Sequence, residues 1–168
     1  MFSVTKGIHI DFAHSVLGHN GPCINIHGHT WFFEVTLGSP TLSQIGFVAD
    51  FKELKTKVLQ PIHDVLDHSY ATSQEFFKAI KSPLSDVGRA LMLTRINVTT
   101  DFAQRSVYGA TLESCGGIKV VTFDFNPTSE RLAKWLFHVA DLAFPSMVKE
   151  AAVYETLHPV QSVARYRQ

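Results

Sequence analysis

This sequence has little cysteine, no long apolar run and no excess of one charge. Its two cysteines, Cys23 and Cys115, are too few for the disulfide framework of a small secreted protein. It has no run of about 18 apolar residues that could span a bilayer, and its first residues lack the apolar core of a signal peptide. Its 15 basic residues match its 15 acidic ones, so no overall field attracts nucleic acid or an anionic membrane. We therefore expect a cytoplasmic protein with no nucleic-acid and no membrane partner.

The composition is that of a single compact domain. Hydrophobic residues make up 45% of the 168 positions, so the chain is long enough to bury a sizeable core. No repeat or low-complexity tract separates one part of the chain from another. We expect one domain over residues 1–168.

Four segments alternate between polar and apolar residues in the way that is typical of strands. They are residues 4–14, 27–37, 118–125 and 151–157. A turn built on Gly18–Pro22 separates the first two, which we expect to pair as a hairpin.

Two segments have the spacing of amphipathic helices. The first runs from Asp50, which with Glu53 resembles a capping box, to Leu66, and Pro61 is expected to kink or interrupt it. The second covers residues 128–143.

Residues 71–117 are harder to interpret. Helical character is present in residues 73–80 and 85–95, with a gap between them. We treat the whole segment as an insertion.

Histidine is concentrated where charged residues are absent. Between Asp11 and Glu34 there is no formally charged residue, yet four of the nine histidines lie there. His27 and His29 are two apart on an expected strand, so both rings project from one face, about 7 Å apart at the backbone. His14 can lie beside them if the hairpin pairs. Three neutral nitrogens would leave one position of a tetrahedral zinc open, as catalytic sites require, and we predict one such zinc per chain.

The same residues have a plainer interpretation, in which the two histidines are polar residues near a turn and His14 is structural. Cys23, four residues before His27, favours the zinc site, because a thiol near zinc ionises readily and can act as a base. Cys115 has no such neighbours and is assigned no function.

Six elements resemble the 6-pyruvoyltetrahydropterin synthase family and, within it, the 6-carboxytetrahydropterin synthases of the queuosine pathway. In chain order they are Phe12-Ala13-His14, Cys23-Ile24-Asn25-Ile26-His27-Gly28-His29, Gly46-Phe47-Val48-Ala49-Asp50-Phe51, Leu66-Asp67-His68, Pro127-Thr128-Ser129-Glu130 and Tyr154-Glu155-Thr156. The resemblance covers residues 8–70 and 126–157. It departs from the family at Ile10, where an aromatic residue is usual, at Arg131, where Asn is usual, and in the 71–117 insertion.

The resemblance implies an enzyme, a zinc-dependent lyase that acts on 7,8-dihydroneopterin triphosphate. Cys23 would be the base, while Asp67 would orient His68 to exchange a proton on the other side of the substrate. An exposed Asp-His pair at a helix end is the alternative. Thr128 and Glu130 would support substrate binding, although both also suit helix capping.

Glu155 shares a strand face with Ala151, Val153 and Leu157, where a carboxylate costs free energy unless it is paired. The amino-pyrimidinone edge of a pterin offers two parallel N–H donors that match a carboxylate. We predict that Glu155 anchors the pterin and also takes part in catalysis.

The family's fold is the tunnelling fold, an α+β fold with a four-stranded antiparallel sheet and two helices on one face. It assembles as trimers that stack into hexamers, with active sites where subunits meet. The resemblance thus implies a homo-oligomer that carries the insertion at 71–117.

The expected reaction converts 7,8-dihydroneopterin triphosphate to 6-carboxy-5,6,7,8-tetrahydropterin, releasing acetaldehyde and triphosphate. The three-residue spacing between Cys23 and His27 favours this carboxy product. Two alternatives are a 6-pyruvoyltetrahydropterin synthase and a catalytically silent module that binds zinc or pterin.

Overall fold

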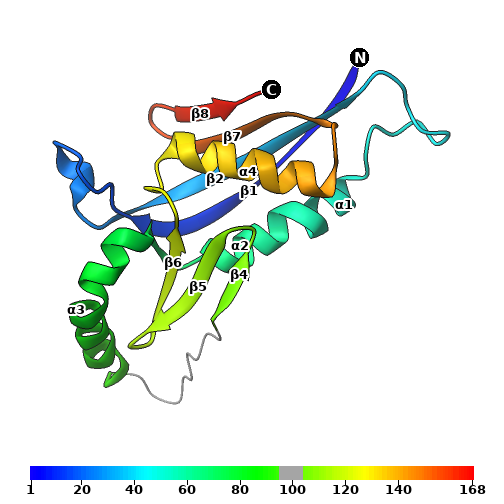
Figure 1. The fold of residues 1–168 in the computed structure, drawn as a ribbon. Coiled ribbons are helices and arrows are strands. Elements are labelled where there is room, and N and C mark those ends of the chain that lie inside the picture. Colours follow the sequence, from blue (N-terminus) through cyan, green and yellow to red (C-terminus); the bar gives the residue numbers. More distant parts are fainter. Residues whose placement is uncertain (95–103) are drawn as a thin grey trace. The chain divides into compact units, whose positions relative to one another are not determined.

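A computed structural model describes residues 1–94 and 104–168 of the chain (Figure 1). These residues form eight strands in the sheet order β4-β5-β6-β3-β1-β2-β7-β8, with parallel and antiparallel neighbours. The fold is therefore α+β with a mixed sheet, whereas the expected sheet had four antiparallel strands. The additional strands are short, and β3 is buried along its whole length, so its sequence has none of the alternation that marks a half-buried strand.

The chain divides into two compact units. The first contains residues 1–10, 29–64 and 128–168, and the second contains residues 11–28 and 65–127. Strands β1 (Phe2–His14) and β2 (His27–Ser39) each contribute residues to both units.

In the first unit, β2 pairs antiparallel with β7 (Val148–Thr156), and β7 pairs antiparallel with β8 (Ser162–Tyr166). Helix α4 (Ser129–Ala143) packs against β7 and β8 (Figure 1). The side chains of β2 that face the core are large and fully buried; they are Trp31, Phe33, Val35 and Leu37. The predicted strands at 27–37 and 151–157 and the predicted helix at 128–143 are confirmed to within a few residues.

The helix predicted from Asp50 to Leu66 changes type along its length. It consists of α1 (Phe51–Leu54), a π-helical segment η2 (Lys55–Leu59) and α2 (Gln60–Leu66). Asp50 caps it by accepting a hydrogen bond from the Lys52 N–H, whereas Glu53 pairs with Lys57. The N–H of Gln60 donates to the carbonyl oxygen of Lys55, five residues back instead of four. The regular α-helical hydrogen-bond pattern is therefore already interrupted next to Pro61, which has no N–H to donate. Pro61 therefore causes a local change of helix type, and the chain stays helical.

In the second unit, the end of β1 pairs parallel with β3 (Tyr70–Ser73), and β3 pairs parallel with β6 (Ile118–Phe123). Strand β5 (Ala110–Cys115) is antiparallel to β6 and to β4 (Arg105–Val107). The predicted strand at 118–125 corresponds to β6.

Helix α3 (Gln74–Met92) packs against β3, β5 and β6. The gap expected between helical segments at 73–80 and 85–95 is wrong, because one helix continues through Pro83. Arg95, the last residue of the second expected segment, lies outside the described residues. Ile80 and Leu84, on either side of that proline, pack on one cluster with Phe77, Cys115 and Val120. This shared packing holds both halves of the helix in line.

Helix α3 also approaches the turn between β5 and β6 very closely at Gly88. A Cβ there would lie 2.5 Å from the Gly116 carbonyl oxygen and 2.6 Å from that of Cys115. Across residues 1–94 and 104–168, no helix has the length and hydrophobicity needed to cross a bilayer.

Candidate metal centre

The ends of β1 and β2 carry the three predicted metal ligands. His14 continues the buried face of β1 that includes Ile10 and Phe12, and the residue is only 1% exposed. His27 and His29 continue the face of β2 that Trp31 and Phe33 bury in the core. The alternation of each strand therefore places its histidines on the same face as its core residues, with His14 buried and His27 and His29 partly buried.

His14 and His27 face each other through their Nε2 atoms, which are 3.1 Å apart. The Nδ1 of His14 lies 2.9 Å from the Pro127 carbonyl oxygen, and the Nδ1 of His27 lies 2.8 Å from the Asn25 carbonyl oxygen. A carbonyl oxygen only accepts, so Nδ1 is the protonated nitrogen of each ring. With this tautomer in two neutral rings, the Nε2 lone pairs point at each other and repel, whereas a cation held by both nitrogens would be attracted to them.

This arrangement fits a zinc ion. Nitrogens bound at 2.0–2.1 Å to a tetrahedral zinc are about 3.3 Å apart, close to the observed separation of the two Nε2 atoms. The carbonyl groups of Pro127 and Asn25 fix the orientation of the rings, as the outer partners of metal-bound histidines commonly do.

Glu155 lies next to His29. Val153 on β7 is opposite Phe33 on β2, and alternate residues of a strand share a face, so Glu155 and His29 project to the same side. The Glu155 Oε1 is 3.6 Å from the His29 Nε2, and both side chains are 27% exposed. The distance is longer than a hydrogen bond and corresponds to an ion pair if the imidazole is protonated.

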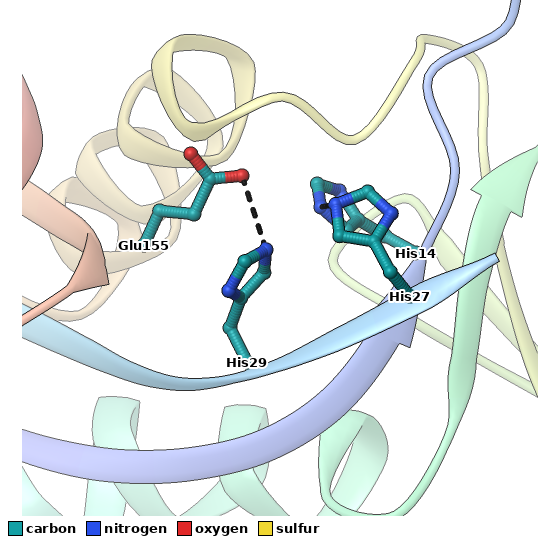
Figure 2. Close-up of side chains that lie close together, drawn as sticks. All are labelled: His14, His27, His29 and Glu155. Atoms are coloured by element: carbon teal, nitrogen blue, oxygen red, sulfur yellow. Dashed lines mark hydrogen bonds and ion pairs between the residues drawn. The ribbon is translucent and has the colours of Figure 1, made fainter. Parts of the chain in front are cut away.

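The ligand atoms of His14, His27, His29 and Glu155 all lie within 4.8 Å of one another (Figure 2). Three imidazoles and a carboxylate are a donor set that suits zinc. The sequence had indicated the histidines as ligands and Glu155 as a substrate anchor, but it had not indicated that Glu155 comes so close to them. The register of β2 against β7 brings them together, and no spacing within one segment reveals that pairing.

Cys23 lies in a single 3₁₀ turn, Pro22–Ile24, in the connection between β1 and β2. The thiol is half-buried and free, and its sulfur is not one of the clustered ligand atoms. Cys115 is buried in the packing beneath α3, where burial raises the pKa of its thiol and the Sγ donates to the Lys81 carbonyl. These surroundings keep Cys115 a neutral core thiol.

Asp67 and His68 form a turn directly after α2. The Asp67 Oδ2 is 3.6 Å from the His68 Nε2, and the His68 side chain is 82% exposed. Neither residue belongs to the ligand cluster. The pair predicted from the sequence is therefore present, with its imidazole turned to solvent.

Thr128 and Glu130 lie at the start of α4. The Thr128 hydroxyl accepts a hydrogen bond from the Arg131 N–H and caps the helix, and Glu130 is in the first turn. Pro127, which accepts from His14, directly precedes the cap, so the α4 start adjoins a predicted ligand. The second role predicted for these residues, contact with substrate, stays a prediction.

Comparison with known proteins gives one consistent result. A sequence model of the 6-pyruvoyl tetrahydropterin synthase family matches residues 3–167. A 6-carboxy-5,6,7,8-tetrahydropterin synthase of Rickettsia felis is 24% identical over 163 residues, which cover 93% of this chain and 95% of that protein. A protein of the same name from Haemophilus influenzae is 35% identical over 77 residues, which cover 44% of this chain and 55% of that protein.

Solved structures resemble the chain over nearly its whole length. An uncharacterised protein of Wolinella succinogenes has a TM-score of 0.75 at 21% identity, with 99% of this chain and 98% of that one covered. The 6-pyruvoyl tetrahydropterin synthase of Caenorhabditis elegans has a TM-score of 0.60 at 18% identity, with coverage of 99% and 95%. At these identities the likeness concerns the fold.

Proposed function

The chain belongs to the 6-pyruvoyl tetrahydropterin synthase family of pterin lyases, and from that premise we propose that it is a zinc-dependent 6-carboxytetrahydropterin synthase. It would convert 7,8-dihydroneopterin triphosphate to 6-carboxy-5,6,7,8-tetrahydropterin, with release of acetaldehyde and triphosphate, as a step toward queuosine. It would act in the cytoplasm, where its two free thiols stay reduced.

The observation that carries the proposal is the paired orientation of His14 and His27. Each ring is fixed through Nδ1 by a carbonyl, and the two Nε2 atoms are left at the separation of ligands on one ion. His29 is the proposed third ligand. Zinc bound there would supply Lewis-acid catalysis, which makes the C–H and O–H bonds of the substrate side chain more acidic.

The remaining residues would bind substrate and move protons. Cys23 lies outside the ligand cluster and has a half-buried thiol, which suits a base that accepts a proton from the substrate. Asp67 would orient His68, whose exposed imidazole would exchange a proton with the substrate. The Glu155 carboxylate would accept hydrogen bonds from the pterin edge and assist proton transfer, with Thr128 and Glu130 as supporting contacts.

The exposure of His68 supports a further part of the proposal. An imidazole that is 82% exposed is a poor proton donor unless another surface covers it. We propose that the chain is a homo-oligomer, a trimer or hexamer, in which a neighbouring subunit covers this group. Size-exclusion chromatography with light scattering measures the mass, and a monomer at micromolar concentration would contradict this.

Two other functions remain as candidates. A 6-pyruvoyltetrahydropterin synthase needs the same groups and yields a product that keeps three side-chain carbons. The relatives from Rickettsia felis and Haemophilus influenzae bear the carboxy name, which together with the Cys23–His27 spacing favours the carboxy product. A silent zinc- or pterin-binding module would keep the site without turnover.

One experiment distinguishes these functions. The zinc-loaded protein is incubated with 7,8-dihydroneopterin triphosphate, and the products are identified by mass spectrometry. We expect 6-carboxytetrahydropterin and acetaldehyde; a pyruvoyl product would identify the other synthase, and an unchanged substrate would identify the silent module.

The metal is tested on the same preparation. We expect about one zinc per chain, and we expect His27→Ala to lose most of it. His19→Ala is the matched control, because His19 lies in the β1–β2 connection, eight residues before His27, and is not among the clustered ligands. Equal zinc in both variants would refute the site.

A further inference from the structure

The peptide unit that joins Asp67 to His68 is held at both ends. Its carbonyl oxygen accepts a hydrogen bond from the Lys119 ammonium at 2.6 Å, and its N–H donates to the Asp11 carbonyl oxygen at 2.7 Å. Lys119 is on β6 and Asp11 is on β1. Two strands therefore fix the plane of this one peptide from opposite ends.

The conformation that these contacts hold is an unusual one. His68 has φ of 55°, in the left-handed region that residues other than glycine seldom adopt. Such a conformation persists only where the surroundings determine it, and it is concentrated at functional sites. The rotation about the N–Cα bond of His68, which φ measures, sets the direction of its exposed imidazole.

Strand β1 makes two further contacts with the same turn. The Asp11 N–H donates to the Asp67 Oδ1 at 3.3 Å, and the Ala13 N–H donates to the Ser69 carbonyl oxygen at 2.9 Å. The carboxylate of Asp67 is thereby held 3.6 Å from the His68 Nε2. The contacts from β1 are made by its backbone and do not depend on its side chains. Among the contacts described above, the Lys119 ammonium is the one side-chain group that lies outside the turn itself.

Lys119 is placed for this contact by the sheet register. Val120 is opposite Tyr70 in the parallel pairing of β6 with β3, so Lys119 is level with the turn just before β3. The side chain is half-buried, and its charge strengthens the hydrogen bond to the carbonyl. A lysine at a helix end can also act as a plain cap for α2, a role that would affect stability alone.

We propose that Lys119 is a positioning residue for the Asp67–His68 pair. By holding the Asp67 carbonyl it fixes the plane of the peptide, the left-handed conformation of His68 and so the direction of the imidazole. The assignment of a reaction to that imidazole rests on the proposed function, whereas the effect on the turn does not.

The activity test uses the zinc-loaded, full-length protein. Lys119→Met should lower kcat for 7,8-dihydroneopterin triphosphate by about 10- to 100-fold, with KM and zinc content unchanged, because the group is misplaced and not removed. Lys119→Arg, which keeps a charged donor, should recover most of the rate. Lys81→Met is the matched control, since Lys81 joins α3 to Glu113 of β5 and does not contact the turn; it should keep the wild-type rate.

A double substitution shows whether Lys119 acts through His68. In a His68→Ala background, Lys119→Met should cause no further loss of kcat, because the group that it positions is already gone. Full additivity of the two losses would overturn the proposal. So would a Lys119→Met protein that only melts at a lower temperature and keeps its kcat, as a plain helix cap predicts.

A separate readout needs no turnover. Hydrogen exchange followed by NMR should show a protected His68 amide in the wild type and exchange at least about 10-fold faster in Lys119→Met, but not in Lys81→Met. If Lys119→Met does not fold, Lys119→Gln replaces it. Faster exchange in a protein without pterin turnover would refute the proposed function and keep the positioning role; unchanged exchange would refute the positioning role.

Discussion

We propose Cys23 as a base and not as a metal ligand. Its sulfur is outside the cluster formed by His14, His27, His29 and Glu155. We therefore expect Cys23→Ala to retain zinc and to lose turnover by about 10²- to 10⁴-fold, the usual effect of removing a positioned acid-base group. Metal analysis and steady-state kinetics measure the two quantities.

Cys115→Ala is the control for this substitution, because that thiol is buried beneath α3 and should affect neither quantity. Loss of zinc from Cys23→Ala would make the sulfur a ligand. Full activity would remove it from the mechanism and leave His68 as the base.

Glu155 can be tested for two roles with one substitution. If its carboxylate binds the pterin edge, Glu155→Gln replaces one acceptor with an N–H that faces a donor, and binding should weaken by about 2 kcal/mol. Calorimetry with a pterin and the zinc-loaded protein measures this loss. Because Glu155 lies 3.6 Å from His29, the zinc content of the variant shows whether it also holds the metal.

Glu113→Gln is the matched control, since Glu113 pairs with Lys81. It should bind pterin as the wild type does. Tight binding of pterin by Glu155→Gln would contradict the anchor role, and loss of zinc would identify Glu155 as a ligand.

Among the elements, helix α3 packs against the β5–β6 turn at Gly88, where there is no room for a side chain. Gly-to-Ala substitution within a helix ordinarily stabilises it by about 1 kcal/mol. At Gly88 the new Cβ would lie 2.5 Å from a backbone oxygen that cannot turn away, so sterics outweigh helix propensity. We expect Gly88→Ala to lower the free energy of unfolding by about 1–3 kcal/mol.

Urea denaturation measures that change, and Ser82→Ala is the control because Ser82 is exposed on the same helix. Ser82→Ala should have a free energy of unfolding equal to or slightly higher than that of the wild type. A Gly88→Ala protein that is more stable than the wild type would show that α3 can move away from the β5–β6 turn.

The same elements show what the sequence can and cannot predict. Strands β1 and β2 and helix α4 have clear periodicity, and their predicted bounds agree with the structure to within a few residues. Strand β3 has no alternation because all four of its residues are buried, so period alone could not identify it. The gap expected between residues 80 and 85 is helical in the structure. Ile80 and Leu84 pack on one cluster, and these tertiary contacts outweigh the hydrogen bond that Pro83 cannot make.

The candidate site shows the same limit. The parity of β2 indicated that His27 and His29 share a face, and the neighbouring strand supplied His14. The proximity of Glu155 to His29 depends on the register of β2 against β7. The proximity of Lys119 to Asp67 depends on the register of β3 against β6. Neither register follows from one sequence.

For the whole molecule, we expect acid to lower the free energy of unfolding partly by protonating Glu150. Burial alone would raise the pKa of Glu150, but hydrogen bonds from Arg165 and Arg167 lower it below its usual value. A group with a depressed folded pKa stabilises the protein above its unfolded pKa, near 4.3, and that contribution is lost as the pH falls through the folded value.

Glu150→Gln should therefore reduce the free energy of unfolding at pH 7 by on the order of 1 kcal/mol and much less at pH 3. Urea denaturation at the two pH values measures the difference. Glu53→Gln is the control, because the Glu53–Lys57 pair is half exposed and should matter little at either pH. An equal loss at both values would show that the carboxylate charge is not responsible.

The contacts of β1 also constrain how related genes can differ. Asp11 and Ala13 hold the turn at residues 67–69, and His14 is the next residue along. One added or deleted residue between Asp11 and His14 would turn the imidazole to the opposite face of the strand and away from His27. Evolution should therefore tolerate length changes in the connection at residues 15–26 and remove them from residues 11–14, where the chain itself sets the spacing between the Asp67–His68 pair and the proposed ligand His14.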